Sequence, residues 1–155
     1  MDRGSRLAID VGTVRIGLAV SDPDSILSTP LPALIRSKLL GETLQEILSL
    51  ITDNGVVEVF IGDPLSLSGS ETESTKDARQ FANQLAELTS VPVRLVDERL
   101  TTVTASSKLR LNGLNAKTAK SLIDSASAVE ILEQALNITK QSGKPAGSRA
   151  GGLHD

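Results

Sequence analysis

The sequence has no cysteine, tryptophan or tyrosine, and its one histidine is His154, the penultimate residue. The absence of cysteine excludes disulfides, thiolate zinc sites and a thiol nucleophile, and it fits a cytoplasmic protein. Because His154 lies in a Gly/Ser-rich stretch, we do not expect an imidazole base. Acid–base chemistry would therefore have to come from carboxylates, lysines or metal-bound water.

Aromatic residues and long apolar runs are also scarce. Phe60 and Phe81 are the only aromatic residues, which argues against base stacking as the grip on single-stranded nucleic acid. No apolar run approaches the roughly 18 residues of a membrane span, and the first residues do not resemble a secretory signal. A chain of 155 residues is long enough for one domain with a substantial core.

Charge is unevenly distributed along the chain. The net charge is −3, yet residues 94–120 carry six basic and two acidic side chains, so this segment is +4 and the remainder is −7. Such a segment could hold phosphates, or it could be an ordinary solvated helix face.

Apolar periodicity predicts a mixed α/β fold. Residues 6–11 and 15–21 predict a β-hairpin, and Pro30 and Pro32 restrict the next strand, 26–35, to a sheet edge. The further elements expected are a helix at 42–52, a strand at 56–62, a helix at 71–89, a strand at 91–96, and helices from Thr101 or Thr102 to Leu111 and over 116–137. The prediction is one domain over residues 1–137, with a five-stranded sheet whose first three strands are antiparallel, followed by parallel βα units with helices on both faces. Residues 138–155 lack periodicity and are expected to form a disordered tail.

Three carboxylates stand in apolar surroundings. Asp10 and Glu98 each follow an apolar run, and Asp124 lies in an Ala/Leu/Ile-rich helical stretch. A buried carboxylate is costly unless it is paired or binds a metal, and oxygen ligands without histidine or cysteine suit Mg²⁺ or Mn²⁺. Each acid also has a structural reading: Asp10 could accept turn N–H groups, Glu98 could belong to a charged loop, and Asp124 could be satisfied by a local hydrogen bond.

Two arginines lie next to these acids. Arg15 follows the turn after Asp10, and Arg99 follows Glu98, so both could contact phosphate, or both could form surface ion pairs. The helix start at 69–72 could also bind phosphate, although Glu71 and Glu73 favour ordinary pairing with the helix dipole.

Four blocks of sequence stand out: Ile9–Asp22, Ile61–Leu65 with Gly69–Glu71, Asp97–Thr102, and Asp124–Ala128 before Ile131–Leu132. Together these blocks resemble the YqgF/RuvX family. The resemblance implies an RNase H-like fold and metal-binding catalytic acids at Asp10, Glu98 and Asp124. Asp97 is the alternative to Glu98 if the strand register differs by one residue. The chain departs from the family pattern at Asp63, which could become a fourth ligand or crowd the site, and at Ser127, which replaces a usual alanine.

The resemblance implies a metal-dependent nuclease in 5′-end processing of pre-16S ribosomal RNA, with Holliday junction resolution as the alternative. Arg15 and Arg99 would bind the nucleic acid, and the protein would be a monomer or weak homodimer away from membranes. Two other classes stay open. The Asp-x-Gly-Thr turn at Asp10 also resembles the first phosphate loop of the actin/hexokinase superfamily, and a non-catalytic RNA-binding assembly factor could use the same fold.

Overall fold

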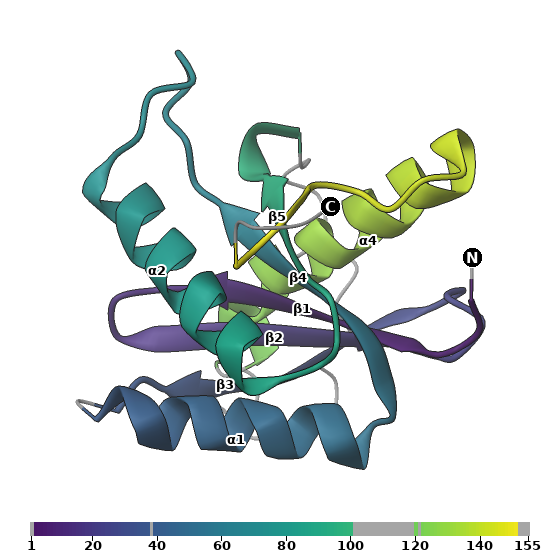
Figure 1. The fold of residues 1–155 in the computed structure, drawn as a ribbon, viewed down its shortest axis with the longest axis horizontal. Coiled ribbons are helices and arrows are strands. Elements are labelled where there is room, and N and C mark those ends of the chain that lie inside the picture. The colour runs from purple at the N-terminus through teal and green to yellow at the C-terminus, as the bar shows by residue number, and fades with distance from the viewer. Residues whose placement is uncertain (1, 38, 101–119, 121, 152–155) are drawn as a thin grey trace.

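The computed structural model describes residues 2–37, 39–100, 120 and 122–151 (Figure 1). The helix expected up to Leu111 and most of the basic segment lie outside the described residues. Within the described part of the chain, no helix combines the length and the apolar composition that crossing a membrane requires.

Six strands form one mixed sheet in the order β3-β2-β1-β4-β5-β6. The strands are β1 (Ser5–Val11), β2 (Arg15–Ser21), β3 (Ser28–Ile35), β4 (Val56–Asp63), β5 (Val93–Asp97) and β6 (Ser148–Arg149). The pairs β1–β2 and β2–β3 are antiparallel, β1–β4 and β4–β5 are parallel, and β6 joins β5 antiparallel. The predicted fold class is confirmed, but the predicted count of five strands is wrong, because β6 adds a sixth.

The first three strands follow the sequence prediction closely. The Gly12 N–H donates to the Arg15 carbonyl at 3.0 Å and closes the β1–β2 hairpin. Strand β3, which contains Pro30 and Pro32, lies at the edge of the sheet, where a missing ladder donor is tolerated.

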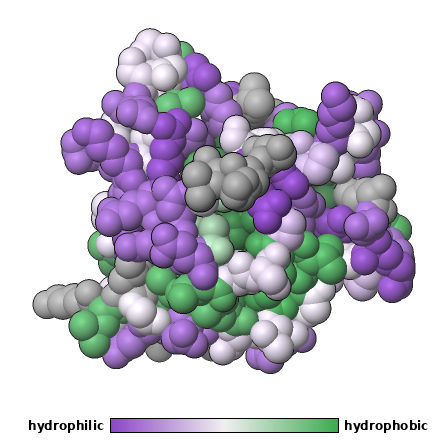
Figure 2. Space-filling view, viewed as in Figure 1, coloured by the Kyte–Doolittle hydropathy of each residue, from purple (hydrophilic) through white to green (hydrophobic). Residues whose placement is uncertain are grey.

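Helices cover both faces of the sheet (Figure 1). Helices α1 (Leu40–Asp53) and α2 (Glu73–Leu88) pack on one face, and α4 (Ala126–Ser142) packs on the other. Successive residues of a strand point to opposite faces. Leu7 and Ile9 therefore pack toward α1 and α2, whereas Ala8 packs toward α4. Figure 2 shows hydrophilic side chains gathered over α2 and the loop before it.

The segment after residue 137 contributes to the fold instead of forming the expected tail. Helix α4 continues to Ser142 and ends at Gly143, which has a φ of 74°, as is common for a glycine that ends a helix. Strand β6 follows, and Ala146 and Ala150 on either side of it are buried. Small residues and a two-residue strand give no periodic signal, so composition alone suggested disorder. Residues 152–155 lie outside the described residues.

Candidate active site

Asp10 and Glu98 face each other across the sheet. Asp10 lies near the end of β1, and Glu98 opens the short 3-10 helix η1 (Glu98–Leu100) directly after β5. Their side chains hydrogen-bond to one another, and the Ser127 side chain also hydrogen-bonds to Asp10. Burial raises the pKa of Asp10. Burial, followed by the negative charge of Asp10, raises the pKa of Glu98 to about 8. The pair therefore holds a proton at neutral pH, in a place where a cation would equally relieve the repulsion.

A glycine on the intervening strand makes this contact possible. Strand β4 lies between β1 and β5, and a Cβ atom on Gly62 would overlap Glu98 Oε1 and lie 2.8 Å from both Glu98 Cδ and Ile131 Cδ1. The Glu98 side chain thus crosses β4 directly over Gly62, on the face covered by α4, to reach Asp10.

Asp124 approaches the same pair from the helix side. Gly17 is the register partner of Asp10, and a Cβ atom on Gly17 would lie 2.8 Å from the Asp124 carbonyl oxygen and 3.5 Å from Asp10 Cβ. Gly17 therefore lets the Asp124 backbone sit against β2 beside Asp10. The Asp124 carboxylate itself pairs with Arg15, whose Nε lies 3.4 Å from Oδ2.

The surroundings of Asp124 differ in one respect from the sequence prediction. A continuous helix over 116–137 would place Asp124 on one face with the residues that pack on the sheet. Instead Asp124 precedes a break at Ser125, and α4 begins at Ala126. Asp124 is therefore the last helical residue before the break and not part of α4.

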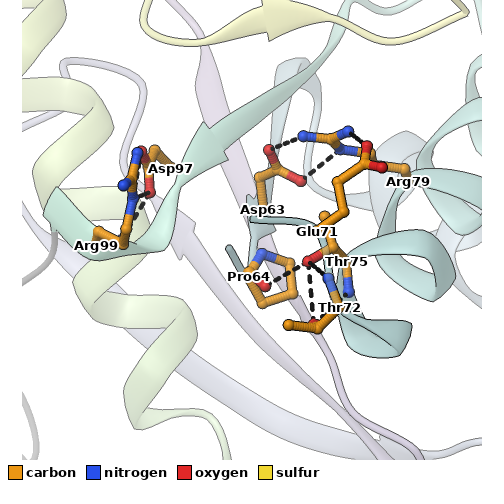
Figure 3. Close-up of polar contacts among 8 residues, drawn as sticks. All are labelled: Asp63, Pro64, Glu71, Thr72, Thr75, Arg79, Asp97 and Arg99. Carbon is orange, nitrogen blue, oxygen red and sulfur yellow. Dashed lines mark hydrogen bonds and ion pairs between the residues drawn. The ribbon is translucent and has the colours of Figure 1, made fainter. Parts of the chain in front are cut away.

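Asp63 and Asp97 lie on the other face of the sheet, because strand residues alternate. Val96 packs toward α4. The next side chain, Asp97, therefore points to the opposite face of the sheet, and the Glu98 side chain lies again on the face that α4 covers. Asp63, the register partner of Asp97, points toward α2, where Arg79 donates two hydrogen bonds of 2.9 Å to it and also pairs with Glu71 (Figure 3). Glu98, rather than Asp97, therefore reaches Asp10.

Both candidate phosphate-binding arginines are engaged with acids. Arg99 lies 2.6 Å from Asp97 (Figure 3) and lowers the pKa of that carboxyl, and Arg15 pairs with Asp124. Each is only partly buried, with 35% of the Arg99 side chain and 46% of the Arg15 side chain exposed. A phosphate could therefore compete for either guanidinium.

The site offers oxygen ligands only. Among the described residues, no three His, Cys, Asp or Glu side chains are already spaced to hold a metal ion: Asp10 and Glu98 touch, while the Asp124 carboxylate faces Arg15. The donor chemistry fits a hard divalent cation. Burial is the main cause of the raised pKa values of Asp10 and Glu98, because it disfavours their charged forms when no cation compensates them.

Sequence reasoning did not identify Gly17 and Gly62 as parts of the site. The available signal was a glycine inside each strand pattern, which marks a close approach of another group. The sequence singled out Ser127 because it replaces an alanine that is usual in the family, and the structure shows that its side chain contacts Asp10.

The fold is similar to solved structures of the RNase H-like class. The chain aligns with Thermus thermophilus RuvC, solved in complex with a Holliday junction substrate, at a TM-score of 0.61 and 15% identity, covering 94% of this chain and 99% of that one. A second structure of RuvC from the same organism gives a TM-score of 0.59 at 13% identity. These likenesses establish an RNase H-like fold.

Sequence comparison then defines the family. Residues 4–138 match the family described as "RuvX: Holliday junction resolvase". A protein of Clavibacter michiganensis is 45% identical over 148 residues, covering 96% of this chain and 92% of its own. One from Leifsonia xyli is 47% identical over 147 residues, covering 95% and 94%. Both are named "Putative pre-16S rRNA nuclease". The chain belongs to the RuvX family, which confirms the resemblance found in its sequence motifs.

Proposed function

We propose that this RuvX-family nuclease hydrolyses phosphodiester bonds with a divalent metal ion, in 5′-end processing of pre-16S ribosomal RNA. The observation that carries the proposal is the convergence of Asp10, Glu98 and Asp124 on one face of the sheet. Gly62 leaves room for the Glu98 side chain, and Gly17 leaves room for the Asp124 backbone. The substrate class comes from the names of the relatives.

In this proposal Asp10, Glu98 and Asp124 hold Mg²⁺ or Mn²⁺. The bound ion would activate water and stabilise the charge that develops on the phosphodiester. Asp10 and Glu98 would hold the ion in their deprotonated forms, with their shared proton released to solvent, and Ser127 would orient the Asp10 carboxylate by its hydrogen bond.

Arg15 and Arg99 position the substrate phosphates. Each would exchange its present acid partner for a phosphate oxygen. Release of Arg15 would also free the Asp124 carboxylate, so substrate contact and completion of the ligand set would be linked. Arg79 neutralises Asp63, which excludes Asp63 from the proposed ligand set.

The second candidate is Holliday junction resolution, favoured by the description of the family. Cutting a four-way junction needs two sites that face paired strands, and hence a dimer. We propose a monomer or weak homodimer, and only the homodimer could serve this second candidate. A cytoplasmic location follows from this role and agrees with the absence of cysteine.

A side-by-side cleavage assay tests the proposal. A labelled pre-16S ribosomal RNA 5′ region and a mobile four-way junction are incubated with the full-length protein in Mg²⁺, in Mn²⁺ and in chelator. We expect metal-dependent cutting of the RNA. Preferential cutting of the junction would instead establish the resolvase. RNA binding without metal-dependent cleavage would indicate an assembly factor, and tight ATP binding by calorimetry would revive the nucleotide-binding alternative.

A further inference from the structure

Ser125 joins the turn after Asp124 to the sheet through its hydroxyl group. Oγ accepts a hydrogen bond from the Leu18 N–H at 3.0 Å and donates one to the Leu31 carbonyl at 2.6 Å. Leu18 and Leu31 are register partners on β2 and β3, and Ser125 is fully buried. The hydroxyl group of a residue more than 90 positions away thus bridges two paired strands.

The strand pairing is irregular at this point. Ile16 pairs with Leu34, but Leu18 pairs with Leu31, so β3 contains one residue more than β2 across this interval. The extra length includes Pro32, which has no N–H to donate. The β2–β3 ladder is therefore interrupted where the Ser125 hydroxyl enters.

The hydroxyl is also diverted from its usual local role. Ser125 is the N-cap residue of α4, yet its side chain makes no capping hydrogen bond. A serine at this position normally accepts from an N–H in the first turn of its own helix. Its backbone, at φ −96° and ψ 3°, breaks the helix directly after Asp124. The hydroxyl group therefore attaches the chain to the sheet and does not stabilise the start of α4. Such a departure from local preference is expected at functional sites.

We infer that Ser125 is a positioning residue that holds Asp124 in register with Asp10. Its attachment to Leu18 fixes the turn one residue from Gly17, over which the Asp124 carbonyl and Ser125 Cα lie. The same turn leads to Ser127, which contacts Asp10. The inference rests on the proposed function only in taking Asp124 as a metal ligand.

The chain provides a closely matched control in Ser21. This serine is also buried, and its hydroxyl accepts from the Arg6 N–H at 2.9 Å and donates to the Asp22 carbonyl at 3.0 Å. It lies at the opposite end of β2 from Gly17. Ser125→Ala and Ser21→Ala therefore delete the same atom and the same two kinds of hydrogen bond, but only the first touches the proposed site.

Two readouts separate positioning from general stability. In the metal-free protein, hydrogen exchange at residues 122–128 should be faster in Ser125→Ala, beyond any change shared with Ser21→Ala. Mn²⁺ affinity and kcat should fall by about 10- to 100-fold in Ser125→Ala, with KM within about twofold of wild type, as is typical for the loss of a group that orients a ligand. Ser21→Ala should retain the wild-type affinity and kcat. Ser125→Cys, which keeps the shape and a weak donor, replaces the alanine variant if that variant does not fold.

Unchanged exchange at residues 122–128 in the Ser125 variant would overturn the inference. Equal losses of Mn²⁺ affinity in the two variants would also overturn it, because the effect would then be general. A wild-type protein that cleaves no nucleic acid would count against the proposed function alone, since the metal-free exchange comparison still decides the role of Ser125.

Discussion

Gly62 lies directly beneath the Glu98 side chain, and a Cβ atom at this position would overlap Glu98 Oε1. The Gly62→Ala substitution should therefore displace Glu98 from Asp10. A misplacement of about 1 Å can cost about 100-fold in rate, and we expect a loss of that size in metal-dependent cleavage. Gly41→Ala is the matched control, because a Cβ atom there meets nothing within 4 Å. Equal activity in both glycine variants would show that this contact is not needed.

The raised pKa of Glu98 predicts an unusual pH dependence of stability. The pKa is about 8 in the folded protein, against an ordinary value of 4.5. The folded state therefore keeps a proton that the unfolded state loses, and this contribution to stability falls as pH rises from about 4.5 to about 8. Glu98→Gln should abolish that fall in the metal-free protein.

Urea unfolding between about pH 5.5 and about pH 8.5 measures this effect above the range where ordinary carboxylates titrate. The exposed Glu87→Gln variant should keep the wild-type slope. Mg²⁺ should stabilise the wild type more at the upper pH, because ligands must lose their protons to bind metal. A Glu98→Gln variant with the wild-type pH slope would contradict the assignment.

The pair of Asp63 and Arg79 should act through stability. Arg79 donates two hydrogen bonds to the buried Asp63, so Arg79→Ala leaves a carboxylate without its partner and should cost roughly 1–3 kcal/mol. Adding Asp63→Asn removes the orphaned charge and should recover part of that loss. Denaturant unfolding of both single variants and the double variant gives the coupling. Strict additivity would mean that the pair contributes nothing.

Arg15 is predicted to contact a substrate phosphate. Arg15→Ala should weaken nucleic-acid binding and reduce the slope of log affinity against log salt by about 1. Arg3→Ala is the control, since Arg3 is an exposed arginine paired with Asp24 before the start of β1. Filter-binding titrations in catalytically inactive protein, at several salt concentrations, measure both slopes. An unchanged slope in the Arg15 variant would mean that Arg15 pairs with Asp124 but does not contact a substrate phosphate.

Much of the fold was predictable because apolar periodicity is strong in the sheet and helices. The hairpin and the proline-containing edge strand needed only local information. Strand β6 did not follow from the sequence, because Ser148 and Arg149 are too few for an alternating pattern and depend on pairing with β5.

The sequence could supply candidate residues for the site but not their geometry. The position of Asp10, Glu98 and Asp124 after or within apolar segments identified them as candidates. The choice between Asp97 and Glu98 depended on strand alternation continuing through Val96 into η1. Whether Asp63 could join the site depended on its ion pair with Arg79, which lies 16 residues further along the chain on another element.

The most direct test of the central claim is metal-dependent cleavage by the Asp124→Asn variant, measured on whichever substrate the wild type cuts. The three acids are proposed to act together as ligands, so this change should abolish cleavage in Mg²⁺ and in Mn²⁺ while the melting curve stays that of a folded protein. Asp53→Asn, at the exposed end of α1, should cleave like the wild type. Wild-type cleavage by Asp124→Asn would contradict the account.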